Sequence, residues 1–81
     1  MEIKIGSVVK AKAGRDSGGL FAVIGIDETY VYICDGKERP VDRPKRKNPK
    51  HLSVTKKVLS AEDMATNRKL KKALANIAEC N

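Results

Sequence analysis

Residues 6–24, GSVVKAKAGRDSGGLFAVI, decide the fold of this chain. Residues 7–13 alternate apolar residues with lysines, which predicts a half-buried strand with a basic outer face. Residues 14–19 are rich in glycine and small polar residues, as in a turn. The nearly continuous apolar run that follows, residues 20–26, predicts a strand covered on both faces, and Gly25 within it predicts a bend or bulge.

Shorter segments continue this pattern along the chain. Residues 30–34 alternate again and predict a third strand, after which Asp35-Gly36 favours a type I′ hairpin turn. Residues 39–42 would return as a short edge strand, and residues 52–55 would form the last one. Five short strands with tight turns favour an antiparallel barrel, because closing the sheet removes its exposed edges.

The period changes in the last part of the sequence. Residues 61–78 predict a helix capped by Ser60. One stripe of this helix is apolar, at Leu70, Ala73, Leu74, Ile77 and Ala78. We therefore expect a barrel over residues 1–57 and an amphipathic helix over residues 58–81, packed on the barrel or on a partner.

Length and composition limit the classes of protein. The chain has 81 residues, 41% of them hydrophobic, which suits one small domain and excludes a large enzyme with an interdomain cleft. No run approaches the ~20 apolar residues of a membrane span, and the N-terminus lacks the pattern of a secretory signal. These features predict a cytoplasmic protein without a membrane partner, in which Cys34 and Cys80 are reduced thiols.

The net charge of +7 lies in one stretch of the chain. Residues 37–57 hold nine bases against Glu38 and Asp42, whereas the rest is near neutral. Such a stretch is a solvated loop, a localisation signal, an attractor of anionic lipid or a contact for nucleic acid. We favour nucleic acid, because an array of phosphates releases counterions when several cations bind it at once.

The candidate RNA-binding residues lie in two groups. The first strand and its turn supply Lys10, Lys12 and Arg15. The basic stretch supplies Arg39, Arg43, Lys45, Arg46, Lys47, Lys50 and His51, with Lys56 and Lys57 at its end. His51 is either a phosphate or base contact or a plain surface residue. Tyr30 and Tyr32 share one face of a predicted strand, where they either stack on unpaired bases or cover the barrel and the helix.

Patterns for catalysis and for bound cofactors are missing from the sequence. Gly14 and Gly19 have the spacing of a phosphate-binding loop, but Leu20 and Phe21 stand where that loop needs Lys and Ser or Thr. A lone histidine and no CxxC pair argue against a metal site and against a nucleophile activated by a base. We expect no enzyme activity, no catalytic residue, no metal and no cofactor.

Residues 6–24 resemble a KOW motif, a strand–turn–strand unit found in several ribosomal proteins and in transcription elongation factors. Gly14 and Gly18 match the glycines of its turn. Residues 31–36, the basic stretch and residues 50–55 extend the likeness to the e-type large-subunit ribosomal proteins of the fourteenth family. The resemblance implies a mainly β fold, a small SH3-like five-stranded antiparallel barrel with a C-terminal α-helix. It also implies cytoplasmic residence and contact with RNA, often ribosomal RNA.

Two functional hypotheses follow from the residues and the resemblance. The first is a monomeric, non-catalytic RNA-binding protein of the ribosome that contacts phosphates through its basic residues. Ribosomal RNA is its expected partner, and ribosomal or other translation proteins are further ones. The second is a protein–protein adaptor of the translation or transcription machinery, which would dock through the barrel and the helix stripe.

Overall fold

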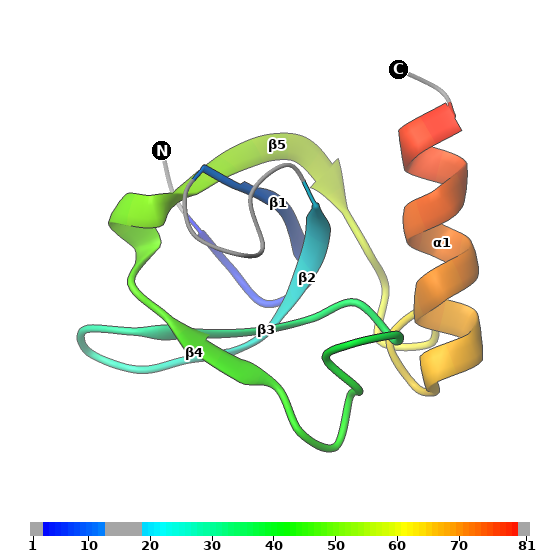
Figure 1. Ribbon diagram of the computed structural model, residues 1–81, viewed down its shortest axis with the longest axis horizontal. Helices are drawn as coiled ribbons and strands as arrows, with labels where there is room; N and C mark the ends of the chain where they lie inside the picture. Colours follow the sequence, from blue (N-terminus) through cyan, green and yellow to red (C-terminus); the bar gives the residue numbers. More distant parts are fainter. Residues whose placement is uncertain (1–2, 13–18, 80–81) are drawn as a thin grey trace.

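The computed structural model describes residues 3–12 and 19–79, and within them the protein is mainly β (Figure 1). The sheet comprises β1 (Ser7–Ala11), β2 (Leu20–Ile26), β3 (Val31–Cys34), β4 (Lys45–Lys47) and β5 (Leu52–Val58). A 3-10 helix, η1 (Pro49–His51), precedes β5, and a helix, α1 (Asn67–Glu79), ends the chain. The predicted turn glycines Gly14 and Gly18 lie outside the described residues, as does Arg15.

The strands form one antiparallel sheet in the order β4-β3-β2-β1-β5. The sheet curls on itself, and η1 joins its two edge strands, β4 and β5 (Figure 1). This arrangement confirms the predicted SH3-like five-stranded barrel with a C-terminal helix.

Apolar side chains form two layers, one on each side of the sheet. The layer inside the barrel consists of Val9, Ala11, Phe21, Val23, Val31, Ile33 and Leu52. On the outer side, Val8, Ala22 and Cys34 pack against Leu70 and Leu74 of α1. Successive side chains of a strand point to opposite faces, so a strand between two apolar layers needs apolar residues throughout. This explains the continuous apolar sequence of β2.

Gly25 marks a bulge in β2, as the sequence predicts. Val23 pairs with Ile33 but Gly25 pairs with Tyr32, so Ile24 is an extra residue on the β2 side. A Cβ on Gly25 would lie 3.1 Å from Cδ2 of Tyr32, which shows that the tyrosine ring packs directly against the glycine. The bulge therefore sets the position of an aromatic ring on the outer face.

The chain does not make the predicted type I′ turn after β3. Gly36 has a φ of +78°, but no described non-glycine residue has a positive φ, so Asp35 lacks the conformation that the turn requires. Instead, Oδ1 of Asp35 accepts hydrogen bonds from the backbone N–H groups of Lys37 and Arg39, each 2.9 Å long. This side-chain cap opens the turn into a longer loop.

The edge strand predicted at residues 39–42 was also wrong: β4 lies at Lys45–Lys47. The backbone N–H of Val41 donates to Oδ1 of Asn67 at 2.7 Å, and the N–H of Arg43 donates to the carbonyl of Pro40 at 2.9 Å. Because these donors are used in a turn that docks on α1, the segment offers them to no strand. Pairing with β3 begins only after Pro44.

Strand β5 extends three residues beyond the predicted end, from residue 55 to Val58. Its pairing with β1 reaches from Leu52 opposite Ala11 to Val58 opposite Ser7, with an irregularity between Ser7 and Val9. The hydroxyl of Thr55 donates to the carbonyl of Val8 at 2.7 Å and fixes this irregular part. The extra residues are two lysines and a valine, all of them exposed. No alternation of apolar and polar residues could therefore predict that they belong to the strand. At the third strand the difference is one residue, since β3 begins at Val31 rather than at 30.

Helix α1 begins six residues later than predicted. Ser60 and Asp63 cap a separate turn, in which the N–H of Asp63 donates to Oγ of Ser60 at 3.2 Å and the N–H of Ser60 donates to Oδ2 of Asp63 at 3.3 Å. The helix is capped instead by Thr66, whose Oγ1 accepts from the N–H of Lys69 at 3.2 Å. No helix in the described part of the chain has the length and apolar character needed to cross a membrane.

Replacing Gly36 with alanine is expected to lower the free energy of unfolding by at least about 1–2 kcal/mol. The positive φ disfavours any side chain, and the added Cβ would overlap the carbonyl oxygen of Asn67 and lie 3.1 Å from the backbone nitrogen of Lys71. Urea denaturation measures the change. Alanine at exposed Glu38 in the same loop is the control, and equal stability of the two variants would show that the loop does not pack on α1.

Candidate nucleic-acid interface

Strand β4 consists entirely of cations and forms an edge of the sheet. Arg46 is exposed and pairs with Tyr32, whereas Lys45 and Lys47 are half-buried and alternate to the other face. An edge strand has a neighbour on one side only. The side chains at this edge, above all exposed Arg46, can therefore approach the backbone of a nucleic acid.

The 3-10 helix η1 places two more candidates beside β4. Asn48 caps it by accepting a hydrogen bond from the N–H of Lys50 at 3.0 Å, and Pro49 occupies its first turn. Lys50 and His51 are both exposed. The cap therefore fixes a rigid corner from which both side chains project into solvent.

A backbone contact brings the lysines in and just after β1 to the same corner. The N–H of Lys12 donates to the carbonyl of His51 at 2.8 Å. Lys12 is exposed, and so is Lys10, which pairs with Ser53 of β5. The structure thus brings together cations from β4 and η1, which are neighbours in sequence, and from the end of β1, which is far from both in sequence. We call this set the basic surface: Lys10, Lys12, Lys45, Arg46, Lys47, Lys50 and His51.

Two predicted residues lie apart from the basic surface. Half-buried Arg39 and exposed Arg43 belong to the loop between β3 and β4. This loop approaches the start of α1, where Val41 donates its hydrogen bond to Asn67 (Figure 1). Arg39 and Arg43 therefore flank the basic surface on the side of the helix.

One contact at the basic surface could not be predicted from the sequence. Cζ of Arg46 lies over the ring of Tyr30, 4.7 Å from its centroid, which is cation–π geometry. Tyr30 precedes β3, and sixteen positions separate the two residues. Only the register of β3 with β4 brings them together, since Tyr32 pairs with Arg46.

A second group of cations lies on α1 and is not among the predicted RNA-binding residues. Exposed basic side chains cover the early turns of α1, and its first turn holds no acidic residue. They are Arg68, Lys69, Lys71 and Lys72. They lie on α1, which packs on β2 rather than on β4 (Figure 1).

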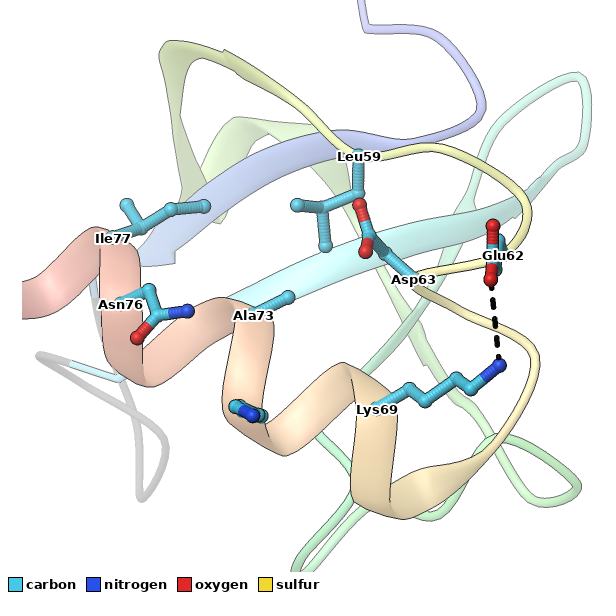
Figure 2. Close-up of a pocket in the computed structure, with 8 residues that line it drawn as sticks. Leu59, Glu62, Asp63, Lys69, Ala73, Asn76 and Ile77 are labelled. Atoms are coloured by element: carbon cyan, nitrogen blue, oxygen red, sulfur yellow. Dashed lines mark ion pairs between the residues drawn. The ribbon is translucent and has the colours of Figure 1, made fainter.

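A hollow near these cations has a mixed lining. It holds about 480 Å³ between α1 and the segment that precedes it (Figure 2). Leu59, Ala73 and Ile77 form its apolar part, and an ion pair of 3.7 Å between Nζ of Lys69 and Oε1 of Glu62 crosses its rim. Because Glu62 and Asp63 balance the lysines there, the hollow offers no excess of positive charge to a phosphate.

Groups for covalent or metal chemistry are scarce among the described residues. Cys34 is fully buried, and this burial, with a smaller effect of the Asp35 charge, raises the pKa of its thiol to about 11. The thiol is therefore protonated at neutral pH and is no nucleophile. Within residues 3–12 and 19–79, no three His, Cys, Asp or Glu side chains gather in a group that could hold a metal ion.

A ribosomal protein is similar to this chain over most of its length. No protein-family model matches the sequence. The chain is similar to large ribosomal subunit protein eL14 of Staphylothermus marinus, with 31% identity over 75 residues. The match covers 91% of this chain and 78% of that protein, so it extends beyond the barrel into α1.

Proposed function

The chain belongs to the family of large ribosomal subunit protein eL14, and on this premise we propose that it is a cytoplasmic, non-catalytic protein that binds ribosomal RNA. The observation that carries the proposal is the basic surface, which gathers most of the predicted RNA-binding residues on β4, η1 and β1. A monomer suffices for this role, because one chain supplies the whole surface.

The proposed mechanism is contact with phosphates and with the shape of a structured RNA. Lysines at the edge of the sheet act as point charges, and Arg46 offers a planar fork of N–H donors. Each phosphate neutralised releases counterions, so affinity grows with the number of contacts and falls with salt. Arg39 and Arg43 extend the surface toward α1, and Arg15, a candidate from the sequence alone, belongs to the same proposal.

The helix is proposed to support the barrel rather than to recruit a partner. A protein–protein adaptor would need the apolar stripe to be accessible, whereas Leu70 is fully buried and Leu74 is 6% exposed. Both side chains pack on Val8, Ala22 and Cys34 of the sheet. On this proposal residues 1–57 contact RNA, and residues 58–81 support the barrel by packing on part of its outer face.

Sedimentation of cell extracts tests the proposed association. An epitope-tagged chain, expressed in the organism that encodes it, is expected to sediment with the large ribosomal subunit and to leave it in a high-salt wash. The loss in salt follows from the electrostatic nature of the contacts. Recovery of the chain only in the light fractions at low salt would contradict the proposal.

A further inference from the structure

Helix α1 leaves part of the sheet's outer face uncovered. It packs on the end of the sheet that holds Ala22 and Cys34. At the other end, the register aligns Gly25, Tyr32 and Arg46 in one row across β2, β3 and β4. Tyr32 is half-buried and Arg46 is exposed, so this row faces solvent.

Neighbouring groups hold the side chains of this row in place. The ring of Tyr32 packs against Gly25, whose missing side chain leaves the space for it. Arg46 lies over the ring of Tyr30, and the carbonyl of Tyr30 accepts a hydrogen bond of 2.8 Å from the N–H of Asp27 at the end of the hairpin. A side chain that is already positioned loses little conformational entropy when a ligand binds.

We propose that Tyr30, Tyr32 and Arg46 form a stacking site for an unpaired RNA base at the margin of the basic surface. This inference rests on the proposed function, since it takes RNA as the ligand. One side of the Arg46 guanidinium lies against Tyr30, and its exposed side accepts the base. The half-buried rings of the two tyrosines provide further π surface beside it.

The types of residue distinguish a base from a phosphate as the ligand. A phosphate is bound by charge and by N–H or O–H donors, and the faces of tyrosine rings supply neither. Bases of any identity stack on aromatic rings and on guanidinium planes. Of the three cations of β4, the one that faces the tyrosines is the arginine, while both lysines alternate to the other face. A lysine would keep the charge but lose the plane.

Two RNA probes separate stacking from phosphate contact. One is a fully paired duplex of about 16 base pairs, long enough to span two minor grooves. The other is the same duplex with a bulge of unpaired nucleotides that carries 2-aminopurine, a base whose fluorescence falls on stacking. Dissociation constants and fluorescence are measured for the wild type and for Arg46→Lys. Lys50→Arg, the reverse exchange at an exposed residue of η1, is the matched control.

The wild type is expected to bind the bulged RNA about tenfold more tightly than the paired duplex and to quench the fluorescence. Arg46→Lys is expected to abolish most of this preference and the quenching, with little change in binding to the paired duplex. Lys50→Arg is expected to keep both. A thermal melt of each variant shows that it is folded.

The other outcomes overturn the inference in distinguishable ways. Equal weakening of both complexes by Arg46→Lys means that Arg46 contacts phosphate alone, and it removes the stacking site. Tight binding of both RNAs by the wild type without preference or quenching removes it too, while the proposed function stands. Failure of the wild type to bind either RNA contradicts the proposed function itself.

Discussion

Alanine at four positions of the basic stretch is expected to weaken binding to ribosomal RNA by about a thousand-fold at 0.1 M salt. The four positions are Arg43, Lys45, Arg46 and Lys47. Each phosphate contact multiplies the association constant by the salt concentration raised to a power of about −0.7 to −0.9. At 0.1 M salt this factor is about five- to eightfold per contact. The factors of four contacts multiply to about a thousand-fold loss of affinity. Without these contacts, the slope of log affinity against log salt should become shallower by about 3.

The control for this variant removes the same charge from another surface. Arg68, Lys69, Lys71 and Lys72 are exposed on α1, and alanine favours the helix at each position. This second variant is expected to bind within about threefold of the wild type, because it changes only the long-range field. Filter binding with both variants, each shown to be folded by its melting temperature, gives the comparison. Equal losses would mean that affinity follows net charge and that β4 is no binding site.

Leu70→Ala is expected to lower the free energy of unfolding by about 3–5 kcal/mol. Leu70 is fully buried between α1 and the outer face of the sheet, where it packs with Val8, Ala22 and Cys34. Truncation of Leu70 leaves a cavity. The sheet cannot readily move to fill it, because core side chains pack on both of its faces. For a domain of this size the melting temperature should fall by about 15 °C or more. Calorimetry of the purified variant measures the effect.

Lys71→Ala is the matched control for the helix. Lys71 is adjacent in sequence but exposed, so its removal should change stability by less than about 0.5 kcal/mol. If Leu70→Ala were as stable as this control, the helix would not be part of the folded domain. The apolar stripe would then be available to a partner, as the adaptor hypothesis requires.

The parts of the fold that the sequence predicted are those with a strong period. The apolar run of β2 and its bulge at Gly25 were predicted because a strand between two apolar layers must be apolar on both faces. The stripe at Leu70 and Leu74 predicted a helix because its spacing fits one face of 3.6 residues per turn. Burial fixes both patterns, so each shows in the sequence itself.

The parts that could not be predicted depend on single tertiary contacts. Strand β4 has no apolar residue, so nothing in its own sequence separates it from a loop. Its position follows from the cap of Asp35 and from the bond between Val41 and Asn67, which keep residues 39–42 out of the sheet. Likewise, Ser60 is a good cap, but its partner Asp63 closes a turn before the helix begins.

The candidate site, like the fold, could be predicted from the sequence only in part. The excess of cations in residues 37–57 was visible in the sequence, since charge needs no fold to be counted. Its grouping was not visible: the contact between Lys12 and His51 joins β1 to η1, and the register of β4 brings Arg46 to Tyr30. These two contacts place the lysines near β1 beside the basic stretch and place Arg46 beside an aromatic ring.

The most direct test of RNA binding by this chain is its affinity for a structured ribosomal RNA fragment and for duplex DNA across a salt series. With about six phosphates contacted, the log–log slope for RNA should be roughly −4 to −5. RNA should also bind more tightly than DNA at every salt concentration. A slope near zero, or equal weak binding to both nucleic acids, would contradict a role in binding ribosomal RNA.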